Sequence, residues 1–313
     1  MTTPRRVWLA GLVLAAIVAG SRSGPVLAQG AATYLYSLSS FSGPLRDDSV
    51  RVVADADADE TYVIYQNRVR IYGPSGMEVF SFGEDLDVGQ ILDLAVDKDG
   101  SIILLSFKDA NTLVTRCDFR GSPVGPFQIS NLPQGLVFGA NRIIRRGDVF
   151  YFASLPAWRV ILTDEKGAYR SQVDLRPLIQ ADPRPKEGAE IIGFTIDADG
   201  SMYFTVPVLF SVYKRASDGT VSSFGKSGST LGQFGVVAGI ATDDRGHLFV
   251  SDKLKCAVLV FDRDFNAITE FGYRGPRPEN LIAPDDIATD RHGRIFVAQV
   301  GRRGVSVFSL VLP

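Results

Sequence analysis

The sequence predicts an all-β protein, a six-bladed β-propeller built from four-stranded antiparallel blades. A short pattern recurs along the chain, in which an apolar run, an aspartate, two further residues and a glycine precede a second apolar run. The marker glycines follow one another at intervals of 46 to 53 residues, at Gly100, Gly147 (a weaker copy), Gly200, Gly246 and Gly293. Repeats of this length are typical of propeller blades. Helical periodicity is almost absent between the copies.

Each copy of the pattern predicts a β-hairpin. Apolar residues lead into the aspartate, as in residues 94–107, and β-branched and aromatic residues follow the glycine. Aspartate accepts hydrogen bonds from nearby backbone amides and glycine tolerates a positive φ, so Asp-x-x-Gly favours a tight turn. A third strand follows, as in residues 258–262, and a fourth ends on Phe-Gly, as in residues 80–83, 222–225 and 269–272. The repeating unit is therefore four antiparallel strands.

Six such units are expected, forming one domain over residues 29–313. The first five are predicted at residues 50–83, 91–130, 138–175, 191–228 and 236–275. The sixth begins near residue 284 and has only three strands before the sequence ends. Residues 34–43 read like the missing fourth strand, so the N-terminal strand is expected to complete the last blade and remove an open sheet edge. The content of 45% hydrophobic and 22% charged residues is normal for a globular domain.

The first 28 residues predict a signal peptide. Arg5 and Arg6 supply a positive start, residues 7–20 supply an apolar core, and Ala28 fits a small-residue cleavage site before Gln29. The apolar core is shorter than the roughly 20 residues of a membrane span. A periplasmic or secreted protein with no membrane span in the mature chain is therefore expected. An uncleaved anchor is the alternative.

Two cysteines, Cys117 and Cys256, fall at the third strands of blades two and five. In a six-membered ring these blades lie opposite each other, whereas a disulfide needs Cα atoms within about 7 Å. Two unpaired and mostly buried thiols that pack as small hydrophobes are therefore expected. A redox or nucleophilic cysteine is the alternative.

The fifth blade resembles an NHL repeat. The resemblance is carried by residues 228–234 (GSTLGQF) and 239–252, followed by the strands within 258–272. NHL proteins form six-bladed propellers, so the resemblance implies this fold for nearly all of the mature chain. It leaves the function open, because propellers serve as binding modules and as enzymes. The Asn-His pair for which the family is named is replaced here by Lys255 and Cys256.

Enzymatic chemistry finds little support in the residues. Some proteins of the wider propeller group are metal-dependent lyases or hydrolases, which need histidine or carboxylate ligands clustered in the channel. The only histidines, His247 and His292, flank marker glycines and therefore belong to first turns. The sequence has no Gly-x-Ser-x-Gly motif, and the glycine-rich residues 225–232 lack the context of a phosphate loop. No catalytic residue, metal ligand or cofactor is predicted.

One charged cluster is predicted in the central channel. Alignment of the innermost strands places Arg51, Asp93 and Asp286 at matching positions of blades one, two and six, which are neighbours in the ring. The matching residues of blades three, four and five are Ala140, Gly193 and Gly239. Buried charges need partners, so a structural ion-pair cluster is the first interpretation. A cation or ligand site and a catalytic role are the alternatives.

Charge is expected to differ between the two faces of the ring, although the net charge is only −2. First turns carry most of the repeat's aspartates, with Arg145 and Arg146 among their bases. The opposite loops join second and third strands and are richer in Lys and Arg, with aromatic and apolar residues beside them. Such a face is typical of a protein interface. The predicted partner-binding residues are Arg68, Lys108, Trp158, Arg159, Phe210, Lys253, Lys255, Arg302 and Arg303. Solvated charges and ordinary turn chemistry are the alternative.

The connection after blade three, residues 174–190, contains three prolines and mixed charges. It predicts a stiff surface excursion on the same face as the basic loops. A contact element or lid for a partner is one interpretation, and a loop without function is the other.

These observations favour a non-enzymatic, exported binding or scaffold propeller. The expected partner is a protein of the cell envelope or extracellular space, such as a subunit of an electron-transfer complex. It would bind the face formed by the loops between second and third strands, called here the basic loop face. An anionic glycan is a second candidate ligand, and nucleic acid is not expected for an exported chain. A metal-dependent lyase or hydrolase that acts in the channel is the competing class.

Overall fold

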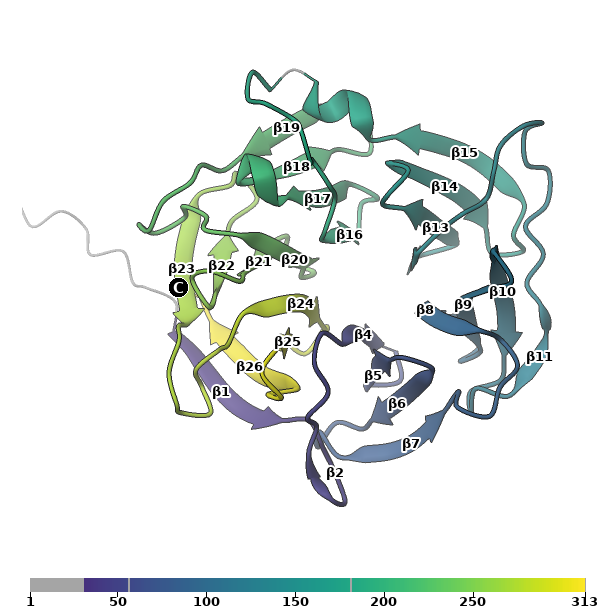
Figure 1. The fold of residues 1–313 in the computed structure, drawn as a ribbon, viewed down its shortest axis with the longest axis horizontal. Coiled ribbons are helices and arrows are strands. Elements are labelled where there is room, and N and C mark those ends of the chain that lie inside the picture. Colours follow the sequence, from purple (N-terminus) through teal and green to yellow (C-terminus); the bar gives the residue numbers. More distant parts are fainter. Residues whose placement is uncertain (1–30, 56, 181, 313) are drawn as a thin grey trace, which may run out of the picture.

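A computed structural model describes residues 31–55, 57–180 and 182–312 as six four-stranded antiparallel sheets set in a ring (Figure 1). The fold class predicted from the repeat is confirmed. Within each of the first five blades the strands follow chain order from the channel outward. The expected signal peptide, residues 1–28, and its cleavage point lie outside the described residues. None of the helical segments in the described part of the chain has the length and hydrophobicity of a membrane span.

The first three blades are regular. Blade one comprises β4 (Arg51–Asp55), β5 (Glu60–Tyr65), β6 (Arg68–Tyr72) and β7 (Glu78–Phe82). Blade two comprises β8 (Gln90–Val96), β9 (Ile102–Lys108), β10 (Asn111–Cys117) and β11 (Pro123–Pro126). Blade three comprises β12 (Arg142–Arg146), β13 (Val149–Ser154), β14 (Arg159–Asp164) and β15 (Tyr169–Asp174).

The other three blades follow the same plan. Blade four comprises β16 (Phe194–Ile196), β17 (Met202–Val206), β18 (Ser211–Arg215) and β19 (Val221–Phe224). Blade five comprises β20 (Val237–Thr242), β21 (Leu248–Asp252), β22 (Ala257–Phe261) and β23 (Ala267–Gly272). Blade six comprises β24 (Pro284–Thr289), β25 (Arg294–Gln299), β26 (Val305–Val311) and β1 (Ala31–Ser37).

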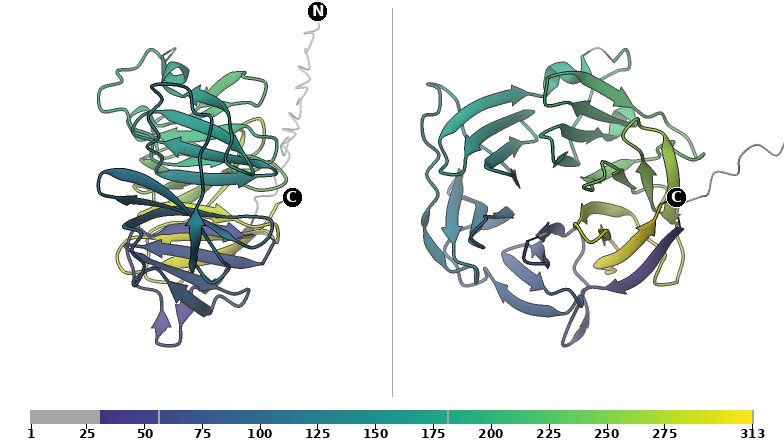
Figure 2. Two further views of the ribbon diagram at one scale, coloured as in Figure 1. Left: turned by 90° about the vertical axis from the view of Figure 1, so that its right-hand side faces the viewer. Right: turned by 180° about the vertical axis from the view of Figure 1, so that it is seen from behind.

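The last blade is closed by the N-terminal strand, as expected. β1 pairs antiparallel with β26, so the two ends of the described chain lie side by side at the rim of the ring (Figure 2). The strand predicted at residues 34–43 begins earlier and stops at Ser37. The serine-rich end forms a separate small hairpin of β2 (Ser39–Ser40) and β3 (Gly43–Pro44), with Phe41 fully exposed at its tip.

The Asp-x-x-Gly turns form as the sequence predicts. In blade five, Oδ1 of Asp243 accepts hydrogen bonds from the backbone amides of Arg245 and His247, at 3.0 and 2.8 Å. Gly246 adopts a φ of +81°, which a glycine accepts without strain. Asp290 caps the equivalent turn of blade six in the same way. The repeated aspartates are therefore used to build turns.

The hydrophobic core lies between neighbouring blades. Between blades six and one, Val52 and Val63 pack with Phe296 and Val307, all at most 1% exposed. Equivalent clusters fill the other interfaces of the ring. Each blade thus buries its faces only against its two neighbours, which is the packing rule of repeat architectures.

Cys117 and Cys256 are both free and buried, as expected. Cys117 packs with Leu104 and Ile71 between blades one and two, and burial raises the pKa of its thiol to about 11. The sulfur of Cys256 donates to the carbonyl of Lys253 at 3.5 Å.

The connection after blade three packs against the ring. It opens with a 3-10 turn, η1 (Arg176–Ile179), whose Ile179 is buried between blades three and four. Farther along, Asp182 accepts hydrogen bonds from Nε of Arg184 at 2.8 Å and from the hydroxyl of Tyr213 at 2.7 Å. Nη2 of Arg184 also donates to Oγ of Ser211 at 2.9 Å. The segment is therefore fixed to blade four by polar contacts.

Replacing Asp182 by asparagine tests this attachment. The hydrogen bonds from Arg184, aided by the one from Tyr213, hold the pKa of Asp182 well below its usual range. The unfolded chain therefore protonates first as the pH falls, and the stability from the carboxylate is present above about pH 4 to 5 and lost in more acidic solution. Asp182→Asn is expected to lower the free energy of unfolding by about 1–3 kcal/mol at pH 7. In urea titrations this difference should shrink steadily below pH 4. Asp109→Asn, at an exposed turn, is the control and should leave the free energy of unfolding close to that of the wild type. A pH-independent difference for Asp182→Asn would contradict the attachment.

Candidate functional site

The channel contains the predicted charged cluster. Nε of Arg51 lies 3.0 Å from Oδ1 of Asp93, and Nη1 of Arg51 lies 3.0 Å from Oδ2 of Asp286. Asp93 is fully buried, and the side chains of Arg51 and Asp286 are 16% and 18% exposed. The two carboxylates raise the pKa of Arg51 against the opposing effect of its burial. The guanidinium therefore ties blade one to blades two and six.

Each carboxylate also bonds the backbone of the next blade. Oδ2 of Asp286 accepts from the amide of Val52 at 2.9 Å, and Oδ2 of Asp93 accepts from the amide of Ile143 at 3.0 Å. Blade three therefore presents Arg142 where blade one presents Arg51. The alignment that placed Ala140 at this position is wrong by two residues, and Ala140 is buried in the interface between blades two and three.

Blades four and five close the ring by close backbone contact. A Cβ on Gly193 would meet the carbonyl oxygen of Ala238 at 2.3 Å, and one on Gly239 would meet Cα of Asp286 at 2.9 Å. Oγ1 of Thr205 bridges the amide of Gly193 and the carbonyl of Ala238, at 2.8 and 2.6 Å. Glycine at these predicted positions is therefore required by the distance between neighbouring innermost strands.

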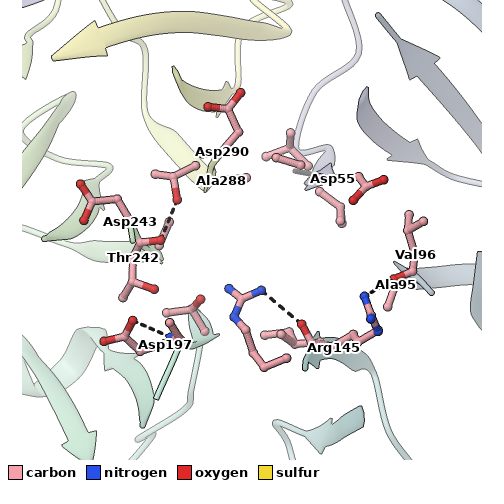
Figure 3. Close-up of a pocket in the computed structure, with 18 of the residues that line it drawn as sticks. Asp55, Ala95, Val96, Arg145, Asp197, Thr242, Asp243, Ala288 and Asp290 are labelled. Atoms are coloured by element: carbon pink, nitrogen blue, oxygen red, sulfur yellow. Dashed lines mark hydrogen bonds between the residues drawn. The ribbon is translucent and has the colours of Figure 1, made fainter. Parts of the chain in front are cut away.

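A cavity of about 310 Å³ lies at the first-turn end of the channel (Figure 3). Its wall is formed by the ends of all six innermost strands, and Arg51 contributes to it while Asp93, Asp286 and Arg142 do not. The carboxylates of the ion-pair cluster thus lie nearer the loop face than the cavity does, and Arg51 stands between them and the cavity. Sequence reasoning missed this cavity, because it assigned the first turns to turn formation and sought function on the other face.

Most of the cavity's charged groups are already engaged. Asp55 accepts from the amides of its own turn, and Asp290 accepts from those of the turn in blade six. Arg145 lies 3.4 Å from Asp97, and Arg291 lies 3.6 Å from Asp57. Arg146 differs, since it has backbone carbonyls as its hydrogen-bond acceptors.

The two histidines lie in first turns, as expected. Nδ1 of His247 is 2.7 Å from Oδ2 of Asp243, within the turn of blade five, and the half-exposed His292 stands 3.8 Å from Asp59. Across the described residues, no group of three or more His, Cys, Asp or Glu side chains has the arrangement of a metal site.

The predicted basic loop face is partly neutralised by ion pairs. Arg68 pairs with Glu84, Lys108 lies 2.5 Å from Asp87, and Lys253 lies 3.8 Å from Asp285. Two backbone carbonyls, of Arg277 and Asn280, accept from Arg303. Arg302 is exposed and Arg159 is half-buried. Of the seven basic residues in the predicted set, four are therefore paired with a carboxylate, whereas the side chains of Arg159, Arg302 and Arg303 have no carboxylate partner among the described residues.

Three of the predicted contact residues are less accessible than expected. Lys255 is 9% exposed and forms a 2.6 Å ion pair with Glu270, which is 3% exposed. Trp158 is 3% exposed, because its turn adopts a φ of +58° and directs the ring onto Phe204. Phe210 is half-buried against the interface of blades four and five. The expectation that Trp158 and Phe210 are exposed anchors is therefore wrong.

An apolar patch on the loop face was not foreseen. It is defined by the exposed side chains of Ile192, Val208, Val236 and Leu254, the last of them 72% exposed. All four stand where blades four and five meet the loop face, because Ile192 and Val236 precede innermost strands and the other two lie between second and third strands. The only sequence signal was the apolar run 207–210, whose Leu209 is in fact buried.

Solved structures share the fold of this chain at low sequence identity. Streptogramin B lyase matches with a TM-score of 0.54 and 14% identity over 90% of this chain and 98% of its own. A gluconolactonase from Xanthomonas campestris matches with a TM-score of 0.59 and 15% identity over 91% of both chains. An auxiliary nutrient binding protein from Bacteroides ovatus matches with a TM-score of 0.60 and 12% identity over 90% and 77%.

These similarities establish the fold alone. No protein-family model matches the sequence, and no curated protein matches it. The six-bladed propeller implied by the NHL resemblance is confirmed, whereas membership of the NHL family stays a prediction.

The role of the ion-pair cluster is tested by Arg51→Met. The change leaves two carboxylates without their cation, one of them fully buried, and is expected to lower the free energy of unfolding by about 3–5 kcal/mol. Adding Asp93→Asn and Asp286→Asn to this variant should recover part of the loss. Arg68→Met removes an exposed pair and should cost at most about 1 kcal/mol. Urea unfolding compares the variants, and equal losses for Arg51→Met and Arg68→Met would refute a structural role for the cluster.

Proposed function

We propose that this chain is an exported, non-enzymatic binding propeller that holds a partner protein on its loop face. The observation that carries the proposal is the apolar patch, in which four exposed branched aliphatic side chains stand at the loop-face ends of the adjacent blades four and five. Exposed apolar patches of this kind mark interaction sites, whereas single exposed residues do not.

The charges around the patch favour a protein over an anionic glycan. A glycan of that kind would need free cations, and most basic side chains of this face are already paired within the molecule. Lys253, 39% exposed, borders the patch beside Leu254. An aliphatic centre with a polar rim is the usual composition of a protein interface. A subunit of an envelope complex, such as an electron-transfer assembly, fits this description.

The fold gives no preference between binding and catalysis, since a lyase, a gluconolactonase and a nutrient binding protein all share it. The binding hypothesis is favoured because the carboxylates of the channel cluster already have hydrogen-bond partners within the protein. Asp93 and Asp286 are held by Arg51 and by backbone amides, so a cation at these carboxylates would have to displace the guanidinium. A metal-dependent lyase or hydrolase remains the competing proposal.

Charge placed in the patch should abolish partner binding. Val208→Glu with Leu254→Glu puts two carboxylates into the apolar centre, and interface centres are depleted of unpaired charge. The matched control is Val79→Glu with Val124→Glu, two exposed valines on the outermost strands β7 and β11. Affinity purification from the native host should recover the same partner with the wild type and the control, and lose it with the patch variant. Equal recovery with all three proteins would sink the proposal.

Export predicts a processed N-terminus. The protein isolated from the native host is expected in the periplasmic or extracellular fraction, and mass spectrometry should find Gln29 as its first residue. Replacing Arg5 and Arg6 by glutamate removes the positive start and should retain the full-length chain inside the cell. Recovery of the unprocessed chain from the cytoplasm of the wild type would contradict export.

A further inference from the structure

Arg146 stands apart from the other charged groups of the cavity. It is the last residue of β12 and lines the cavity, with Nε 2.9 Å from the carbonyl oxygen of Ile196 and Nη1 3.2 Å from that of Arg145. Among the described residues, no carboxylate lies within ion-pair distance of it. The other arginines of the cavity wall, Arg51, Arg145 and Arg291, each pair with an aspartate.

This guanidinium has hydrogen-bonding capacity to spare. An arginine carries five N–H donors in a planar fork, and the two contacts above use two of them. The remaining donors are on Nη1 and Nη2. A carboxylate matches such a fork with two parallel hydrogen bonds, and these are among the strongest that proteins make.

The cavity also offers a free acceptor beside the guanidinium. Asp197 lines the cavity in the adjacent blade, and its charge acts on Arg146 together with that of Asp244 from blade five. Oδ1 of Asp197 accepts from the amide of Ala198 at 2.6 Å, while Oδ2 has no hydrogen-bond partner among the described residues. A carboxylate alone would be repelled by Asp197. A ligand that joins a carboxylate to a hydrogen-bond donor would satisfy both side chains.

Aliphatic side chains also line the cavity. Val53 and Val96, from blades one and two, and Ile144, on the same strand as Arg146, are each half-buried there. In Figure 3, Asp197 lies across the opening from Val96, which stands between Asp55 and Arg145. A ligand that carries an aliphatic group as well as polar groups can contact both kinds of side chain.

We propose that the cavity binds a small aliphatic α-amino or α-hydroxy acid. The carboxylate lies on the fork of Arg146, the amine or hydroxyl of the neighbouring carbon donates to Asp197, and the side chain packs on Val53 and Val96. A volume of about 310 Å³ is at the lower end of the range of small-molecule pockets. The site is at the opposite end of the channel from the apolar patch, and it does not depend on the partner protein.

Calorimetric titration of the purified protein with four related probes tests the ligand class. The probes are leucine, 2-hydroxy-4-methylpentanoate, 4-methylpentanoate without the donor, and leucinamide without the carboxylate. Leucine or its hydroxy analogue should bind, and loss of the carboxylate should weaken binding by roughly tenfold to a hundredfold. The tighter of the first two probes shows whether an amine or a hydroxyl is preferred. No binding by either, or leucinamide binding as tightly as leucine, would overturn the proposal.

Variants then identify the residues. Arg146→Gln should weaken binding of the preferred acid by at least roughly tenfold, and Arg146→Lys should weaken it less because the charge is kept while the fork is lost. Arg170→Gln, on an exposed outer strand of the same blade, is the matched control and should bind as the wild type does. Circular dichroism confirms that each variant is folded.

Asp197→Asn provides a second route that leaves Arg146 intact. It should weaken an amino acid by roughly tenfold and a hydroxy acid less, because the asparagine oxygen still accepts from a neutral hydroxyl. If Arg146→Gln and Asp197→Asn both bind as tightly as the wild type, the proposal fails. The Arg146→Gln and Asp197→Asn variants should still recover the partner protein that the Val208→Glu, Leu254→Glu variant loses, because the cavity and the apolar patch are separate sites.

Discussion

The ring depends on one antiparallel pair, between β1 and β26, that joins the two ends of the described chain within one blade. Without this pair the sixth blade would keep an open sheet edge. The interface between blades six and one would also lose Tyr36 of β1, which packs against it. Every other blade buries its faces against its neighbours, so the packing of the whole ring is continuous only when this pair forms. Phe308, which packs edge-on against Tyr34 at 5.8 Å, shows that the closing strand contributes to the core as well as to the hydrogen bonding.

Closure at the centre is achieved in two different ways around the ring. On one side, charged groups span the gap: Arg51 bridges Asp93 and Asp286, and each carboxylate reaches the backbone of the next blade. On the other side, Gly193 and Gly239 let the innermost strands approach within a distance that excludes a side chain. Both arrangements occupy the same level of the channel, toward the loop face. The cavity described above lies at the first-turn end, where the hydrogen-bond acceptors of Arg146 are backbone carbonyls.

The sequence predicts the parts of the structure that repeat. The period of the Asp-x-x-Gly turns determines the blades, and alignment of the copies brings Arg51, Asp93 and Asp286 together, because equivalent positions of a propeller meet at its axis. Errors arise where a blade departs from the repeat. Blade three lacks the full turn signature, so its innermost strand is misplaced by two residues and Arg142 is overlooked. Trp158 and Lys255 are buried through tertiary contacts, with Phe204 and Glu270, that no local pattern specifies. Arg146 was grouped with the bases of a first turn, because pairing across the ring is not visible in the sequence.

The division of the channel bears on how one scaffold hosts lyases, lactonases and binding proteins. Chemistry at the axis needs groups that are free to change partner or protonation state. Here the axial carboxylates already have partners. Asp93 is fully buried and accepts hydrogen bonds from Nε of Arg51 and from the amide of Ile143, so removing the guanidinium would leave a buried charge uncompensated. A partner protein at one end and a small acid at the other would meet separate surfaces of the ring that share no residue, so occupancy of one site need not alter the other.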